Sequence, residues 1–457
     1  MEQFLRSLPR WATIVSICVA GVAMTMRGAW PTPSEMFILP ATVACIYGAL
    51  RATHANARIL FAGLWTAVVV FAGISIDPPQ QLWPDFRLWW DSAELLFEKH
   101  QSPYLLPGAT AFPFPTYMVV YASRFGGLLP FESAAWLLVA MQLACVGLLY
   151  FFVRGVIVRE GLAVGSGYAD LLLQGLLLLH PTMLFVLYYG QSGIIAGTLL
   201  GGAVWCWRCG KGRLWWHGSA ILMNLAWMVK PQLLMATAFF FLSWLHDTWF
   251  GKRSGNSAAA IGGLLAPWCV GLLSISVPLA FPVYLMAYRD FISVAIHAHT
   301  YNAEVSPNNY ALASILSKAG MRLLGIPVAQ SLPLVATIGA VILVLWNFLS
   351  LQHAKGNTPL VFVPWLLASF LWASSAWRFY LTFLMAGLLL LVAYRDERIS
   401  SGFHLNSFWL ASGIGLTMVL SSFAFTLGIL ILFFLSHELL AEETAAFHDD
   451  GNVEKAV

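Results

Sequence analysis

Residues 133–153 read SAAWLLVAMQLACVGLLYFFV, and none of them is charged. The hydrocarbon core of a bilayer is about 30 Å thick, so a membrane-spanning helix needs roughly 17 to 25 apolar residues in succession. This stretch has that length and composition. We therefore predict that it forms a helix that crosses a membrane, and runs of the same kind recur along the whole chain.

The overall composition agrees with many such helices. Hydrophobic residues make up 59% of the 457 positions, charged residues make up only 10%, and mean hydropathy is +0.75. Soluble domains carry a charged fraction of about 25%, so a soluble fold is excluded. We predict an all-α, polytopic transmembrane helix bundle with about 12 to 14 spans. The expected spans are residues 10–27, 34–51, 59–76, 133–153, 170–189, 191–207, 214–229, 231–249, 258–280, 326–350, 358–374, 378–394, 403–420 and 422–437.

The distribution of Lys and Arg sets the expected orientation, because cytoplasmic loops are enriched in these residues. With the N-terminus inside, 15 of the 24 basic residues fall on the cytoplasmic side. This assignment requires residues 110–130 to lie along the membrane interface instead of crossing the bilayer. We therefore expect a multi-pass protein of the plasma or inner membrane, with both termini in the cytoplasm.

The same orientation places two long polar segments on the outer face, residues 77–132 and 281–325. We predict one transmembrane domain over residues 1–437, followed by an acidic cytoplasmic tail at residues 438–457. The sequence contains neither a recognisable soluble domain nor the clear internal repeat found in many transporters.

The first outer segment contains a predicted amphipathic helix. Residues 83–98 read WPDFRLWWDSAELLFE, and helical spacing begins after Pro84. The apolar face of this helix suits the membrane interface. It consists of Trp89, Trp90, Ala93, Leu96 and Phe97. Asp85 stands at the expected start of the helix, where its carboxylate can be an N-terminal cap, a catalytic base, or both.

Lys230 lies between two apolar runs, in the sequence NLAWMVKPQ at residues 224–232. A charged side chain within a membrane costs about 2.5 kcal/mol or more, so it is a candidate functional residue unless its end reaches the interface. Pro231 breaks the helix at this point. The ammonium group of Lys230 can therefore lie at a kink that lines a cavity.

Other polar residues gather in the remaining outer segments. The turns YYGQSG at residues 188–193 and SSAWRFY at residues 374–380 each join two apolar helices, and Arg378 offers a fixed positive charge that suits a phosphate. The second outer segment contains Arg289, His297, His299, Glu304, Asn308, Asn309, Lys318 and Arg322. Imidazole and carboxylate groups can bind divalent ions, but the spacing of these residues is not a zinc pattern. We expect an anionic ligand, no metal and no other cofactor.

The order of short motifs along the chain resembles glycosyltransferase family 87, whose members are membrane-embedded enzymes of the GT-C class. The similarity covers roughly residues 60 to 395. Each motif is short, so the ordered set carries the resemblance. The motifs are DF at 85–86, WW at 89–90, PY at 103–104, FP at 114–115, GQ at 190–191, KP at 230–231, NNYAL at 308–312 and SAWRFY at 375–380.

The resemblance implies that Asp85, in the DF motif, is the general base. The chain departs from the family pattern at three places. It has Phe-Pro-Thr at residues 114–116 in place of an element similar to Tyr-Pro-Pro, and it has Tyr310 where Ser is expected. Arg378 takes the position of a usual His, which favours anion binding there. These departures leave the sugar and the acceptor open.

The resemblance also implies an inverting glycosyltransferase of the outer membrane face. It would move a sugar, mannose or another hexose or pentose, from a polyprenyl-phosphate-linked donor to a hydroxyl of a glycolipid or glycan acceptor. The donor phosphate would be bound by Lys230, Arg378, Arg289 and Lys318. The other expected substrate-binding residues are Asp91, Tyr104, Tyr189, Gln191, His297, His299, Asn308, Asn309, Trp377 and Tyr380.

Two alternatives remain open on the residues alone. A transporter or flippase for an anionic amphiphile could use the same basic residues as a conduit. A scaffold without a site would explain the apolar helices but would leave Lys230 as a costly charge. Membrane lipids are expected partners in each case, and nucleic acid is not.

Overall fold

The computed structural model describes residues 33–74, 82–105, 124, 128–162, 180–210, 213–233, 235–239, 286, 289–290, 311–353, 359–372, 381–398, 404–418 and 422–453. Every regular element within these ranges is a helix, so the prediction of an all-α protein is confirmed. The predicted spans 10–27 and 258–280 lie outside the described residues, as does most of the predicted interfacial stretch 110–130.

The first half of the described chain builds the part of the molecule that contains the candidate site. Its helices are α2 (Pro33–Arg51), α3 (Ala55–Ile74), α4 (Pro84–Phe97), η1 (Pro103–Leu105), α6 (Phe131–Arg159), α8 (Pro181–Tyr189), α9 (Gly193–Cys209), α10 (Arg213–Val229) and η3 (Pro231–Leu233). Gly190 and Gly210 follow the ends of α8 and α9, and Pro231 follows the end of α10, as expected from residues that end helices.

The second half of the described chain is also helical. Its helices are α14 (Leu312–Leu324), α15 (Val328–His353), η4 (Pro359–Val361), α16 (Phe362–Leu371), α17 (Leu381–Arg398), α18 (His404–Met418) and α19 (Ser422–Val453). Helix α19 begins at the predicted position but continues to Val453, so most of the predicted tail is helical.

Among the described residues, four helical stretches are long and apolar enough to cross a membrane. They are Ala55–Ala72, Phe131–Arg159, Val328–Leu349 and Ala424–Ala441. Shorter apolar helices accompany them at Phe37–Arg51, Gly193–Cys209, Gly218–Trp227, Pro359–Leu371, Leu381–Tyr394 and Ser407–Met418. Together with the composition, these helices make the chain a multi-pass membrane protein.

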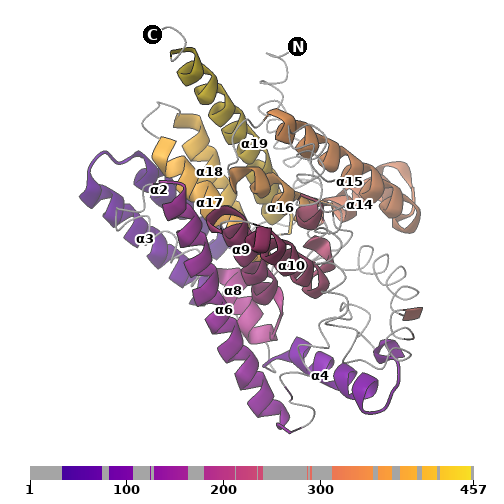
Figure 1. Ribbon diagram of the computed structural model, residues 1–457. Coiled ribbons are helices and arrows are strands. Elements are labelled where there is room, and N and C mark those ends of the chain that lie inside the picture. The colour runs from indigo at the N-terminus through magenta and orange to yellow at the C-terminus, as the bar shows by residue number, and fades with distance from the viewer. Residues whose placement is uncertain are drawn as a thin grey trace.

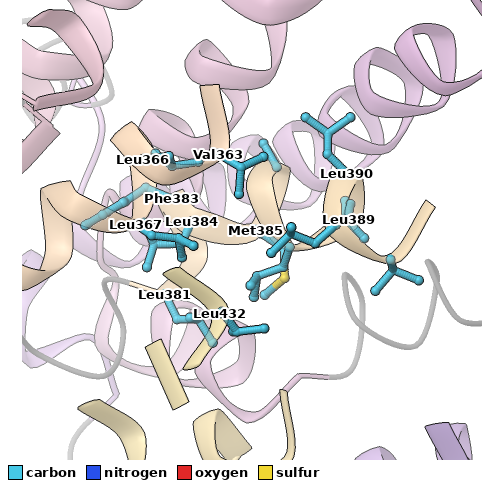
Figure 2. Close-up of a cluster of buried hydrophobic side chains, with 14 of the residues drawn as sticks. Val363, Leu366, Leu367, Leu381, Phe383, Leu384, Met385, Leu389, Leu390 and Leu432 are labelled. Atoms are coloured by element: carbon cyan, nitrogen blue, oxygen red, sulfur yellow. The ribbon is translucent and has the colours of Figure 1, made fainter. Parts of the chain in front are cut away.

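A cluster of buried apolar side chains joins α16, α17 and α19, as Figure 2 shows around Leu366, Leu384 and Leu432. Lipid tails are as apolar as these side chains, so close packing holds such helices together in a bilayer. Helix α9 approaches α17 closely at a glycine. A Cβ atom on Gly197 would lie 2.5 Å from the carbonyl oxygen of Thr382. This contact anchors α9, whose N-terminal end contributes to the candidate site.

Helix α4 lies at the opposite end of the bundle from the C-terminal end of α19 (Figure 1). The predicted helix is confirmed, and four residues of its predicted apolar face, Trp89, Trp90, Ala93 and Leu96, are buried. This face packs against the start of α6. The α6 residues in this contact are Phe131, Ala134, Ala135 and Leu138.

Within the stretch 110–130, the described residues Arg124 and Leu129 both contact α4 or the cluster around it. The guanidinium of Arg124 forms an ion pair with Glu98 at 2.5 Å and lies 4.6 Å from the ring centroid of Trp90. Cation–π contacts of this kind contribute about 0.5 to 2 kcal/mol, more when water is excluded. Arg124 therefore helps to hold α4 against the bundle.

Candidate active site

The turn between α8 and α9 lies at the centre of the candidate site. Gly190 ends α8 in the left-handed conformation, with φ 70° and ψ 39°. The backbone N–H groups of Gly190 and Gln191 both donate to the carbonyl of Val186, the latter at 3.0 Å. Glycine is favoured at such a helix end because a Cβ atom disfavours a positive φ. The turn directs the next residue, Gln191, into the protein, where it is 1% exposed.

The start of α4 is held against this turn. The backbone N–H of Trp83 donates to the carbonyl of Tyr188 at 2.8 Å. Trp83 has a φ of 58°, which is an unusual conformation for a bulky residue and is kept only where the surroundings enforce it. A Cβ atom on Gly190 would lie 2.7 Å from the Cβ atom of Phe86. The first turn of α4 is thereby fixed against the α8–α9 turn.

Asp85 lies in the first turn of α4, and its carboxylate points to the α8–α9 turn. The N-cap of α4 is Trp83, and no side chain caps the helix there. The Oδ2 atom of Asp85 instead accepts a hydrogen bond from the Nε2 atom of Gln191. The interpretation of Asp85 as a helix cap is therefore wrong, although its charge still favours the helix N-terminus.

Lys230 reaches the same amide from the other side. Its Nζ atom donates to the Oε1 atom of Gln191 at 3.1 Å, and the residue is 2% exposed. The predicted break at Pro231 is confirmed, because α10 ends at Val229 and the short helix η3 follows. The Nε1 atom of Trp372 donates to the carbonyl of Gln232 at 3.2 Å, which holds η3 beside the end of α16.

Gln191 thus bridges a carboxylate and an ammonium group. A carboxylate can only accept hydrogen bonds and an ammonium can only donate them, so the bridging group needs one end of each kind. A glutamine amide meets this requirement in one orientation, with its nitrogen toward Asp85 and its oxygen toward Lys230. The three residues come from α4, the α8–α9 turn and the end of α10, which are far apart in the sequence.

The electrostatics of the site favour a base that works near neutral pH. Burial raises the pKa of Asp85 to about 6, while the hydrogen bond from Gln191 and the positive charge of Lys230 both lower it. A general base is most effective when its pKa lies near the working pH. At neutral pH the carboxylate is mostly ionised yet remains able to take up a proton.

The other residues predicted to bind the substrate or its phosphate differ in where they lie. Asp91 is exposed, Tyr104 is buried beside α4, and Tyr189 is half-buried with its ring 5.6 Å from that of Phe185. Arg289 is exposed and forms an ion pair with Asp290 at 3.3 Å. The remaining predicted residues lie outside the described part of the chain, apart from Lys318, which lies half-buried on α14. They are His297, His299, Asn308, Asn309, Trp377, Arg378 and Tyr380.

One residue of the site was missed. Gln142 of α6 is fully buried, and its Nε2 atom donates to the carbonyl of Gln191 at 2.6 Å. The available signal was an amide side chain within the uncharged stretch 133–153. A polar residue in a spanning helix is uncommon and usually faces the interior of the bundle.

The glycine of the turn provides a direct test of this geometry. Gly190→Ala should destabilise the protein by about 1 to 3 kcal/mol and sharply reduce its function, because the left-handed conformation and the contact with Phe86 both oppose a Cβ atom. The matched control is Gly147→Ala in α6, where a Cβ atom would meet no atom within 4 Å. Thermal unfolding in detergent measures the stability of both variants. Equal unfolding midpoints for Gly190→Ala and Gly147→Ala would contradict the geometry described for the turn.

Comparisons with known proteins give one likeness. No family model matches the chain, so the resemblance to glycosyltransferase family 87 remains a prediction. No curated protein matches it either. A search of solved structures finds the crystal structure of ArnT from Cupriavidus metallidurans bound to undecaprenyl phosphate. The TM-score is 0.29 and the identity is 14%, over 85% of this chain and 79% of that chain. A likeness at this level carries no argument, so function has to be argued from the residues of this chain.

Proposed function

We propose that the chain is an inverting membrane glycosyltransferase of the GT-C type. It transfers a sugar from a polyprenyl-phosphate-linked donor to an acceptor hydroxyl at the outer face of the membrane. The observation that carries this proposal is the hydrogen-bonded arrangement of Asp85, Gln191 and Lys230, which puts a carboxylate base and a cation on opposite sides of one buried amide.

The reaction assigns a separate task to each charge. Asp85 takes the proton from the acceptor hydroxyl as its oxygen attacks the anomeric carbon of the donor. The bond between that carbon and the phosphate oxygen breaks, and the bonding electrons leave with the phosphate. Attack from the face opposite the phosphate inverts the anomeric configuration. A cation fixed in place before the reaction stabilises the negative charge as it develops on the leaving oxygen.

The exposure of the two charged groups fits these tasks. Asp85 is half-buried and Lys230 is almost fully buried, and the amide of Gln191 lies between them. We propose that the acceptor approaches from the side of Asp85. A phosphate is a suitable partner for a buried ammonium, because charge-assisted hydrogen bonds are roughly twice as strong as neutral ones. We propose that Arg378 joins Lys230 in binding the donor phosphate.

The test is glycosyl transfer by the purified protein in detergent. Polyprenyl-phosphate donors carrying labelled mannose or a labelled pentose are mixed with envelope lipids and glycans as acceptors. The expected result is a labelled product with inverted anomeric configuration, determined by NMR. Chemistry in detergent needs no sealed compartment, so a transporter would give no product there. Movement of the donor across the membrane of a vesicle, without transfer of its sugar to an acceptor, would contradict the proposal.

The pH dependence of the rate gives a second prediction. Only the ionised carboxylate can accept a proton, and the pKa of Asp85 is about 6. Activity should therefore rise with pH through about 6 and fall about tenfold for each pH unit below that midpoint. The ratio kcat/KM for the donor, measured across the acidic range, would show this because it reports the pKa of the free enzyme. A rate that stays constant well below the midpoint would exclude Asp85 as the base.

A further inference from the structure

We propose that Gln142 is a positioning residue for this reaction. From the spanning helix α6 it holds the backbone of the α8–α9 turn, so that the amide of Gln191 is fixed between Asp85 and Lys230. The inference rests on the proposed function, because it concerns the same site. It adds a fourth element of the fold to the three that supply the site residues.

The hydrogen bonds of Gln142 fix its orientation. Its Nε2 atom donates to the carbonyl oxygen of Gln191 at 2.6 Å and lies 3.5 Å from that of Val186. Both partners are acceptors, so only the NH₂ end of the amide can face them. Val186 is in α8 and Gln191 is the second residue after its end, so a single side chain contacts both sides of the turn.

The burial of Gln142 indicates that its amide group has a role other than packing. Its side chain is fully buried, and its Oε1 atom has no hydrogen-bond partner among the described residues. An unsatisfied buried polar atom destabilises a fold. A residue needed only for packing in α6 could be a methionine of similar volume without that cost. Gln142 is therefore better explained by what its donor end holds in place.

The effect of Gln142 passes through Gln191 to Asp85. When the turn is fixed, the Nε2 atom of Gln191 donates to the carboxylate of Asp85 and stabilises its ionised form. Loss of the anchor frees the turn and weakens that hydrogen bond, so the ionised form is favoured less. The charged group that acts on Asp85 across the site is Lys230, and it stays in place.

The other ionisable groups on the packed elements are the same in every variant. Helix α8 begins after His180, which is buried. Helix α6 brings Glu132, which is exposed, and α8 brings Tyr188 and Tyr189. On α4 itself, Arg87 and Asp91 are exposed. A shift in the titration of Asp85 after substitution of Gln142 can therefore be assigned to the turn.

The experiment compares Gln142→Met with Gln191→Met and with Leu143→Met. Leu143 is the neighbour of Gln142 on α6 and is 54% exposed, so its substitution controls for methionine in this helix. The acidic limb of the rate should move upward by about one pH unit in Gln191→Met and by about half of that or more in Gln142→Met. In Gln142→Met the KM for the donor should change little, and Leu143→Met should behave as the wild type.

A second readout does not depend on activity. A hydrophobic carbodiimide modifies protonated carboxyl groups, and mass spectrometry of the peptide that contains Asp85 gives the pH midpoint of the modification. This midpoint should move upward in Gln142→Met and Gln191→Met together. The combined variant should shift no further than Gln191→Met alone, since the two residues act through one hydrogen bond.

The outcomes separate this inference from the proposed function. If Gln191→Met shifts the labelling midpoint and Gln142→Met does not, the positioning role is overturned. If the labelling shifts occur but the wild type transfers no sugar, the positioning role stands as a structural fact and the proposed function fails. Should Gln142→Met not fold, Gln142→Asn decides, because its amide is one carbon shorter and leaves the carbonyls of the turn without their donor.

Discussion

Asp85→Asn should lower the turnover of glycosyl transfer by about 10²- to 10⁴-fold, the usual contribution of a general base. An asparagine has nearly the same shape as an aspartate, and its oxygen can still accept the hydrogen bond from Gln191. The fold and the binding of the donor should therefore persist. The substitution removes only the ability to accept a proton, so the loss should appear in kcat and not in KM for the donor.

Three measurements test this prediction. Turnover and donor binding are determined on the same purified sample, and the thermal midpoint reports on the fold. The control is Glu132→Gln, which removes another carboxylate at the same end of the molecule, at the exposed start of α6. It should leave turnover within about twofold, because surface substitutions away from special features have small effects. Full activity of Asp85→Asn would remove the proposed base.

The helices could be predicted because apolar runs of spanning length have few other interpretations. The predicted spans 34–51 and 214–229 agree with α2 and α10 within one residue at either end. The apolar face of α4 was also predicted, but its contact was not. Periodicity identifies which side chains avoid water, and it does not distinguish a lipid from the side of α6.

The candidate site was predicted in parts. Asp85, Gln191 and Lys230 were each identified, the first two through short motifs and the third through its charge in an apolar setting. The bridge between them could not be predicted, because it depends on three helix ends that meet only in the folded chain. The cap interpretation of Asp85 failed for a local reason. The chain enters α4 through the left-handed conformation of Trp83, which no sequence rule indicates for a tryptophan.

Gln142 shows another limit of predicting a site from sequence. One amide in a long apolar run is expected to face the interior of the bundle, but it belongs to no motif that would indicate its partner. Its role depends on the carbonyl groups of a turn that lies more than forty residues away. The amino-acid sequence does not show which backbone carbonyl groups will accept a hydrogen bond from a distant side chain. Residues of this kind are found only when the hydrogen bonds of a turn are followed to their donors.

Lys230→Met should weaken donor binding by about 10- to 100-fold, since hydrogen bonds to charged groups contribute about 1.5 to 3 kcal/mol. Methionine keeps much of the volume of the buried side chain and removes its charge. Asp85 then loses the positive neighbour that lowers its pKa, so the acidic limb of the rate should also move above about 6. Binding of polyprenyl phosphate, followed by the thermal shift that it produces, measures the first effect, and the rate profile measures the second.

A double variant separates donor binding from folding. Lys230→Met alone leaves the carboxylate of Asp85 without its cation, whereas Asp85→Asn/Lys230→Met leaves neither charge. The opposite charges of Asp85 and Lys230 lie on the two sides of the Gln191 amide. Removing both of two interacting charges is commonly less destabilising than removing one, so the double variant should regain thermal stability. It should not regain donor binding, because the phosphate still has no ammonium to meet. Arg154→Gln, which removes a cation further along α6, is the control and should bind the donor as the wild type does. If stability and donor binding return together in the double variant, Lys230 stabilises the fold and does not bind the phosphate.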